Sequence, residues 1–173
     1  MTSYVALLRG VNLLGVSTLR MTDLQTIAKE LGLGSPRTFI ASGNLLFKSD
    51  KSETEVKRLL EERLTAHMGR KVVAIVRTAA AMADAARANP FPDAPANTVQ
   101  AFFMDEPPPE NLLDTVRNRA ADERIAAGAR EVYVAYGERG IGRSRLRIPA
   151  AEAGTARNMN TVAKLAELAK EAG

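Results

Sequence analysis

Short apolar runs alternate with amphipathic stretches in the first half of the chain. Residues 4–8 and 72–76 are apolar at odd and even positions alike, which predicts strands at 4–8 and 71–77 that are buried on both faces. Residues 37–41 and 44–48 are β-prone, and Ser42-Gly43 between them predicts a tight antiparallel hairpin. Apolar residues at helical spacing predict helices that start near residues 22 and 52. The first half therefore follows the order βαββαβ.

Both predicted helices carry recognisable ends. Thr22 with Gln25, and Ser52 with Glu55, have the spacing of a capping box, in which the first side chain accepts a backbone hydrogen bond. A glycine, which commonly ends a helix, follows the last apolar positions of each: Gly32 and Gly69. These ends predict two independent, well-bounded helices.

The second half repeats this pattern less clearly. Residues 78–88 predict an alanine-rich connecting helix, which the prolines of residues 89–97 end. Further strands are predicted at 99–105, 123–127 and 131–136, and further helices from the prolines at 107–109 to residue 119, at 144–152 and at 160–171. No clear final strand is predicted in this half.

These elements predict an α+β protein built from two tandem ferredoxin-like units, each of the βαββα type. We place the first half at residues 1–88, a proline-rich linker at 89–97, and the second half with its C-terminal helix at 98–173. In a single such unit the helices cover one sheet face, so another layer must cover the other face of strands 4–8 and 72–76. The second half or a second subunit would serve, and the oligomeric state stays open.

The composition of the chain excludes several kinds of site and suggests no specific one. Hydrophobic residues make up 46% and charged residues 25% of the 173 residues, as in ordinary globular proteins. There is no cysteine and one histidine, His67, so disulfides, thiolate nucleophiles and cysteine- or histidine-rich metal sites are excluded. No apolar run reaches the roughly 18 to 20 residues of a membrane span, and the start lacks a signal-peptide pattern. We therefore expect a cytoplasmic protein without a membrane partner.

Two turns of the first half are predicted to lie side by side. The first and third strands are neighbours in a βαββαβ unit, so the turn after residue 8 meets the hairpin turn at one sheet edge. The candidate ligand-binding residues at this edge are Arg9, Gly10, Asn12, Ser42, Gly43 and Asn44. A guanidinium, amides, a hydroxyl and close backbone approach suit a carboxylate or phosphate. Alternatively, the glycines and asparagines only satisfy turn conformations, and Arg9 pairs with a carboxylate.

Two further segments carry candidate anion contacts. Thr155, Arg157 and Asn158 precede the last predicted helix, where Thr155 or Asn158 can cap and Arg157 can face an anion at the helix start. Residues 139–147 carry four arginines and two glycines, which would suit phosphate contacts or simply form a solvated loop. They match neither a P-loop nor a dinucleotide-binding pattern.

Three motifs resemble those of a bacterial family, domain of unknown function 1697. They are Y-V-A-L-L-R-G-V-N at residues 4–12, S-G-N at 42–44 and T-A-R-N at 155–158, and the match covers essentially the whole chain. The chain departs from the family pattern at Leu13, Leu14, Ala41 and Met159. The resemblance implies two ferredoxin-like units and no established activity. The matching positions, Ala156 among them, form the candidate site given above.

Three functions follow as hypotheses. The first is a module that binds a small anionic or phosphate-bearing ligand at the Arg9 edge, with Arg157 as a further contact. The second is an enzyme acting on such a ligand, in which Ser42 or a bound water reacts and Arg9 stabilises developing negative charge. The third is RNA or DNA binding through residues 139–147. No resident metal is expected, and no cofactor is identified.

Overall fold

The computed structural model describes residues 1–11, 19–40 and 43–172. It contains two four-stranded antiparallel sheets, with strand orders β2-β3-β1-β4 and β6-β7-β5-β8, and helices. The predicted α+β class is therefore confirmed. The chain divides into two compact units, which we call the first unit (Met1–Ala83 with the chain from Leu165) and the second unit (Asp84–Lys164).

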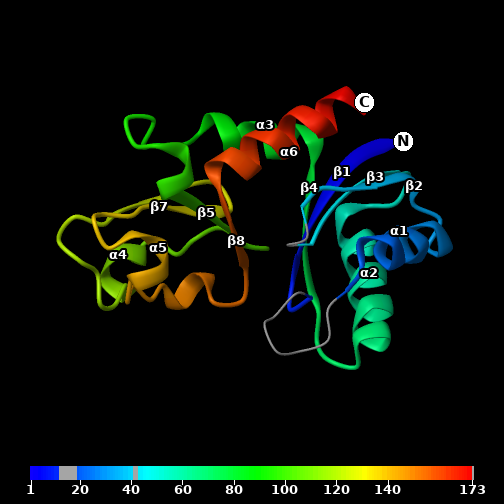
Figure 1. The fold of residues 1–173 in the computed structure, drawn as a ribbon, viewed down its shortest axis with the longest axis horizontal. Helices are drawn as coiled ribbons and strands as arrows, with labels where there is room; N and C mark the ends of the chain where they lie inside the picture. The colour runs from blue at the N-terminus through cyan, green and yellow to red at the C-terminus, as the bar shows by residue number, and fades with distance from the viewer. Residues whose placement is uncertain (12–18, 41–42, 173) are drawn as a thin grey trace. The chain divides into compact units, whose positions relative to one another are not determined.

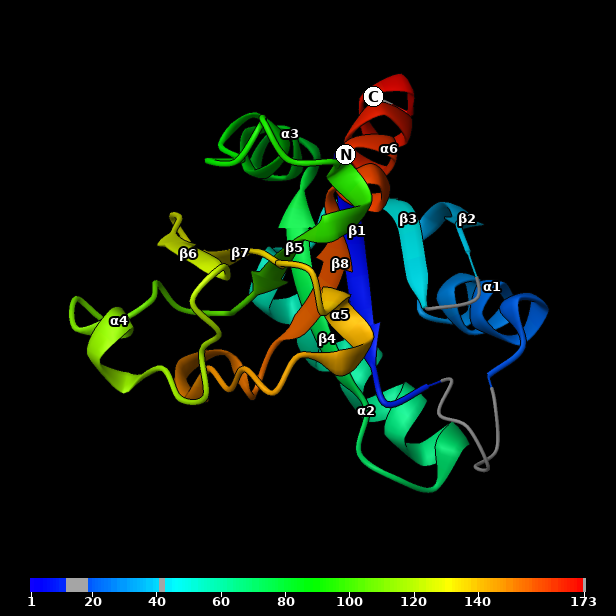
Figure 2. The same ribbon diagram turned by 60° about the vertical axis from the view of Figure 1, so that its left-hand side comes forward.

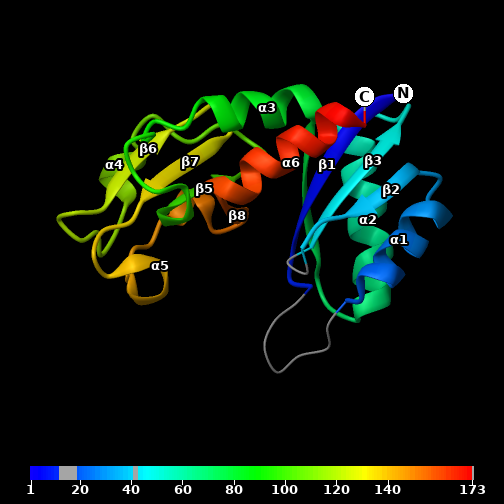
Figure 3. The ribbon, with the colours of Figure 1, turned by 45° about the horizontal axis from the view of Figure 1, so that its top comes forward.

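The first unit has helices on one face of its sheet. In chain order it contains β1 (Thr2–Arg9), α1 (Met21–Glu30), β2 (Gly34–Thr38), β3 (Asn44–Ser49), α2 (Glu53–Met68) and β4 (Val73–Thr78). Figure 1 and Figure 3 show α1 and α2 side by side against this sheet. Leu24, Leu60 and Leu64 bring the apolar sides of the helices into a core with Tyr4 and Phe47, whose rings stack 5.6 Å apart. The opposite side chains of β1 are buried too, as the apolar pattern predicted.

The Ser52 cap predicted from one capping box is confirmed, and the Thr22 cap predicted from the other is wrong. Ser52 Oγ accepts the Glu55 N–H at 3.2 Å and begins α2, which Gly69 ends in the left-handed region. By contrast, α1 begins at Met21, so Thr22 lies inside the first turn and Arg20 is the N-cap residue. Arg20 forms an ion pair with Asp23 at 3.0 Å across this turn.

The hairpin starts earlier than predicted. β2 covers Gly34–Thr38 instead of residues 37–41, because the turn towards β3 already begins at Phe39. The Phe39 N–H donates to the Asn44 carbonyl at 3.1 Å, and Ile40 has a positive φ of 58°. The predicted antiparallel pairing of the two strands is confirmed.

The second unit contains shorter elements joined by longer irregular stretches, as Figure 2 shows around α4 and α5. After the connecting helix α3 (Ala79–Arg87) come η1 (Ala96–Thr98), β5 (Val99–Phe103), α4 (Leu112–Thr115), β6 (Arg124–Ala127), β7 (Glu131–Ala135), α5 (Gly140–Arg143), η2 (Pro149–Ala151), β8 (Thr155–Asn158) and α6 (Met159–Glu171). Its strand order repeats that of the first unit, with the second strand at one edge and the fourth at the other. No helix among the described residues is long and apolar enough to cross a membrane.

Three predictions for this half are wrong. The helix predicted to residue 119 is only the four residues of α4, because Val116 is extended and Arg117 pairs with Arg147 through two backbone hydrogen bonds of 2.9 Å. The same pairing prevents a helix over 144–152, where only the short η2 forms. A final strand does exist, since β8 pairs with β5 along the sheet edge.

Candidate functional site

The two turns of the predicted anion site do meet at one edge of the first sheet. β1 and β3 are neighbours, with Leu7 opposite Asn44, and the Leu8 N–H donates to the Gly43 carbonyl at 2.8 Å. The predicted juxtaposition of the segments around Arg9 and Gly43 is therefore confirmed. Asn12 and Ser42, two of the candidate ligand-binding residues, lie outside the described residues.

Both glycines of this edge have conformations that the fold itself requires. Gly10 and Gly43 have φ values of +88° and +85°, which other residues rarely adopt. A Cβ on Gly43 would lie 2.7 Å from Val11 Cγ2, so the turn also packs too closely for a side chain. The Gly10 carbonyl accepts from Arg70 Nε at 2.9 Å. These contacts explain both glycines without a ligand.

Asn44 and Arg9 differ in their surroundings. The Asn44 side chain is fully buried, and its Nδ2 donates to the Phe39 carbonyl at 2.8 Å, closing the hairpin. Arg9 is exposed at the end of β1. Of the described candidates at this edge, Arg9 is thus the charged group that solvent reaches.

The T-A-R-N motif at residues 155–158 forms the strand β8 and the cap of α6. Asn158 Oδ1 accepts the Thr161 N–H at 3.0 Å and so caps α6, as predicted. Thr155 and Arg157 lie in β8, where Arg157 Nη1 donates to Thr155 Oγ1 at 2.8 Å and to the Ala156 carbonyl at 2.9 Å. Arg157 is 8% exposed, and burial lowers the pKa of its guanidinium to about 10. Arg157 is therefore built into the sheet and remains charged at neutral pH.

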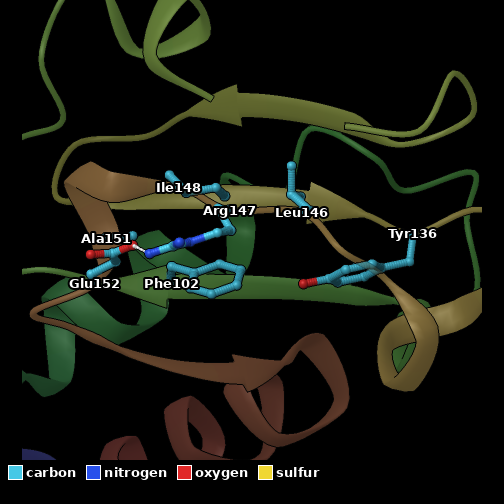
Figure 4. A pocket seen from close by; sticks show the side chains of 7 residues that line it. All are labelled: Phe102, Tyr136, Leu146, Arg147, Ile148, Ala151 and Glu152. Carbon is cyan, nitrogen blue, oxygen red and sulfur yellow. Dashed lines mark hydrogen bonds and ion pairs between the residues drawn. The ribbon is translucent and has the colours of Figure 1, made fainter. Parts of the chain in front are cut away.

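A pocket of about 230 Å³ lies in the second unit and was not predicted from the sequence. Its lining comes from β5, the end of β7 and the irregular segment before β8: Phe102, Tyr136, Leu146, Arg147, Ile148, Ala151 and Glu152. Figure 4 shows the Phe102 ring between the Tyr136 hydroxyl and the Arg147–Glu152 ion pair. Arg147 belongs to the basic stretch that the sequence singled out.

The polar groups of this pocket sit at its two ends. Arg147 Nη2 and Glu152 Oε1 are 2.8 Å apart, and both side chains are more than half exposed. At the other end the Tyr136 hydroxyl donates to Gln100 Oε1 at 2.9 Å. Burial, with the negative charge of Glu123 as a second cause, raises the pKa of Tyr136 to about 12. Tyr136 is consequently a neutral phenol at physiological pH.

Two consecutive carboxylates, Asp122 and Glu123, contact the irregular segment between Tyr136 and Leu146. Glu123 is 2% exposed and accepts hydrogen bonds from the Ala120 N–H at 2.8 Å and from the Ser144 hydroxyl. Asp122 Oδ2 accepts the Glu138 N–H at 2.9 Å, and its carboxylate occupies the space where a Cβ on Gly137 would lie. Through these contacts the two carboxylates hold Gly137, Glu138 and Ser144 in place.

One sequence signal could have pointed to this pocket. In the sequence, the polar Gln100 alternates with Val99 and Ala101 along this strand, and in the structure Gln100 and Phe102 are less buried than Ala101 and Phe103. Phe47 of the first sheet, by contrast, is 3% exposed and belongs to the core. The basic stretch was recognised in the sequence, but its connection with the face of β5 that carries Gln100 and Phe102 was not.

The comparisons with known proteins concern family and fold. Residues 1–133 match the family described as protein of unknown function (DUF1697). The solved structure of the conserved bacterial protein SP0830 from Streptococcus pneumoniae matches with a TM-score of 0.75 and 20% sequence identity, over 98% of this chain and 99% of that one. At this identity the likeness shows the fold alone. No match was found among curated proteins. The match includes the first two predicted motifs and ends before the third, at residues 155–158. Because it covers most of the chain, the chain belongs to the DUF1697 family.

Proposed function

We propose that this protein is a binding module for a small ligand that carries an anionic group, and that the ligand occupies the pocket of the second unit. The pocket has apolar walls formed by Phe102, Leu146, Ile148 and Ala151, with a guanidinium at its edge. Ligand sites in proteins commonly combine an apolar lining with a few polar groups that fix orientation. The pocket has this composition.

The proposal depends mainly on the position of the Arg147 guanidinium at the edge of the pocket. Its guanidinium has five N–H donors in a planar fork, and its exposed ion pair with Glu152 engages Nη2. A carboxylate or phosphate entering the pocket can exchange with the Glu152 carboxylate at this fork. Such an exchange keeps the guanidinium paired, while the rest of the ligand gains apolar contact with the walls.

Titration of the protein with benzoate and with inorganic phosphate tests the proposal. We expect saturable binding of benzoate by isothermal titration calorimetry and a higher melting temperature, because a ligand of the folded state stabilises it. Arg147→Gln should weaken binding at least tenfold, whereas Arg145→Gln removes the same charge two residues away and should change it less than twofold. Equal affinities for the two variants, or no binding by the wild type, would contradict the proposal.

The Arg9 edge is the second place proposed for an anion. Its support is an exposed guanidinium beside the paired turns of β1 and β3. Arg9→Gln should then weaken phosphate binding without changing benzoate binding at Arg147.

The further proposal that the protein acts chemically on its ligand rests on Ser42, and turnover that is lost in Ser42→Ala would support it.

Nucleic-acid binding is a second candidate function, favoured by the basic stretch. Arg139, Arg143 and Arg145 are exposed, and no ion pair is seen for them among residues 1–11, 19–40 and 43–172. If they bind phosphates, affinity for a mixed-sequence oligonucleotide should fall steeply as salt increases, since counterion release drives such binding. No binding at low salt would exclude this function.

We also propose a ferredoxin-like assignment for each unit, on the shared strand order and the alternation of strands and helices. With it we keep the boundaries 1–88, 89–97 and 98–173 and a cytoplasmic location. Limited proteolysis tests the boundaries, because cleavage should concentrate in residues 89–97 if they form a linker.

A further inference from the structure

The two ends of the pocket offer opposite hydrogen-bonding chemistry. The single hydroxyl proton of Tyr136 is donated to Gln100 Oε1 at 2.9 Å. The phenolic oxygen therefore has only lone pairs to offer a ligand. A ligand group that reaches this end must donate a hydrogen bond, from an N–H or an O–H.

An anionic group is disfavoured at the Tyr136 end. The raised pKa of Tyr136 keeps the phenol neutral, and part of this rise comes from the negative charge of Glu123. The same charge repels a carboxylate placed beside the phenol. A carboxylate there would also face oxygen lone pairs without a donor. The anion is consequently directed to the other end.

The Arg147 end has the complementary preference. A guanidinium carries donors and no acceptor, so it binds carboxylates and cannot accept from a hydroxyl or an amine. Glu152 already demonstrates this preference in the structure, with its Oε1 2.8 Å from Arg147 Nη2. The orientation of a bound ligand is thereby fixed, with its acid at Arg147 and its donor at Tyr136.

The middle of the pocket limits the shape and size of the ligand. The Phe102 ring lies between the two polar ends, and aliphatic side chains complete the wall (Figure 4). Aromatic rings pack favourably on one another in stacked or edge-on arrangements. The volume of about 230 Å³ is smaller than the roughly 300–1,000 Å³ of pockets for drug-sized ligands. One ring with two substituents is the scale that fits.

We propose that the ligand is a small planar acid with a carboxylate at one end and a hydrogen-bond donor at the other, of the hydroxybenzoate or aminobenzoate class. This inference rests on the proposed function of the pocket and adds the identity and direction of its ligand. The deciding feature is the pair of opposed polar ends, Arg147 and Tyr136, on either side of Phe102.

Calorimetric titration with a series of para-substituted benzoates tests the inference. We expect 4-hydroxybenzoate and 4-aminobenzoate to bind about tenfold more tightly than 4-methoxybenzoate, which keeps the oxygen but has no donor, a ratio typical of one hydrogen bond. Tyr136→Phe should abolish this difference. Gln100→Leu frees the Tyr136 proton, so it should shift the preference towards 4-cyanobenzoate, which only accepts.

The outcomes separate this inference from the proposed function. If all these acids bind equally well and Arg147→Gln weakens them all, the donor requirement is wrong while anion binding in the pocket stands. If none of them binds, or if Arg147→Gln changes nothing, both are wrong. Tighter binding of the donor-bearing acids that disappears in Tyr136→Phe supports both.

Discussion

The two sheets share one strand order. They differ in the elements that cover one face, which are two long helices in the first unit and short helices with irregular chain in the second. In the first unit α1 and α2 follow the first and third strands, and Leu24, Leu60 and Leu64 are completely buried beneath them. In the second unit the same two connections form only the short helices α4, α5 and η2, of three or four residues each, and irregular chain. Phe102 and Leu146 remain partly exposed there, and a pocket lies between them.

This difference shows where a binding site can arise when two sheets have the same strand order. A long amphipathic helix lays continuous rows of side chains on a sheet and packs it closely. An irregular segment interrupted by Pro149 and held at single points such as Ser144 cannot fill the surface as evenly. We conclude that the pocket follows from the loss of a covering helix, while the sheet beneath keeps its strand order.

The largest expected effect is a packing difference between the two faces. Leu60→Ala in α2 should lower the free energy of unfolding by about 3 kcal/mol, since it creates a cavity in a filled core. Leu146→Ala at the pocket should lower it by only about 1 kcal/mol, because that side chain is already partly exposed. Urea denaturation followed by circular dichroism measures both. Equal losses would mean that the second face is packed as closely as the first.

Enlarging an alanine on each face sharpens the same comparison. Ala28→Met in the core of the first unit should cost about 2 kcal/mol through overpacking. Ala151→Met projects into the pocket and should change stability by less than about 1 kcal/mol while blocking benzoate binding. The same denaturation experiment, with calorimetry for binding, checks the pair. A large loss of stability in Ala151→Met would show that no usable space exists there.

Two serines that anchor the covering segments should behave differently. Ser144→Ala removes a hydrogen bond to the buried Glu123 and should cost about 1–2 kcal/mol, and it should also weaken benzoate binding by loosening residues 144–152. Ser52→Ala removes the cap of α2 and should cost about 1 kcal/mol without affecting binding. If both variants bind benzoate like the wild type, the irregular segment does not shape the pocket.

The smallest effect is spectroscopic and concerns the Tyr136 end of the pocket. Tyr136 should ionise near pH 12 instead of 10, so ultraviolet titration of Tyr136→Phe should lack one phenolate transition near pH 12. Because the folded pKa is the higher one, the stabilisation from this group is complete below pH 10 and is lost as the pH rises through 12. A Tyr136 transition at pH 10 would mean that this end of the pocket is open to water.

Local signals predicted the first unit well. Ser52, Glu55 and Gly69 fix the ends of α2 through contacts within a few residues, so their spacing alone is informative. The order of elements also predicted that the segments around Arg9 and Gly43 meet, because topology determines strand neighbours. Thr22 misled the prediction, since the local pattern was present but the N-cap residue is Arg20, two residues earlier.

The second unit escaped prediction where distant residues decide the structure. The pairing of Arg117 with Arg147 and the contact of Ser144 with Glu123 join segments that are 21 to 30 residues apart, and no local pattern announces them. β8 was interpreted only as the segment that caps the last helix, because Asn158 is a good cap and the strand is only four residues long. The pocket depends on all these contacts. The sequence therefore indicated Arg147 as a candidate anion contact but did not predict the residues that surround it.

The location of the bound anion is the central claim, and chemical-shift mapping tests it most directly. Adding 4-hydroxybenzoate to ¹⁵N-labelled protein should shift the backbone amides of residues 100–104, 136 and 144–152 most strongly. Shifts confined to residues 9–11 and 43–44, with the pocket unchanged, would contradict it and assign anion binding to the edge of the first sheet.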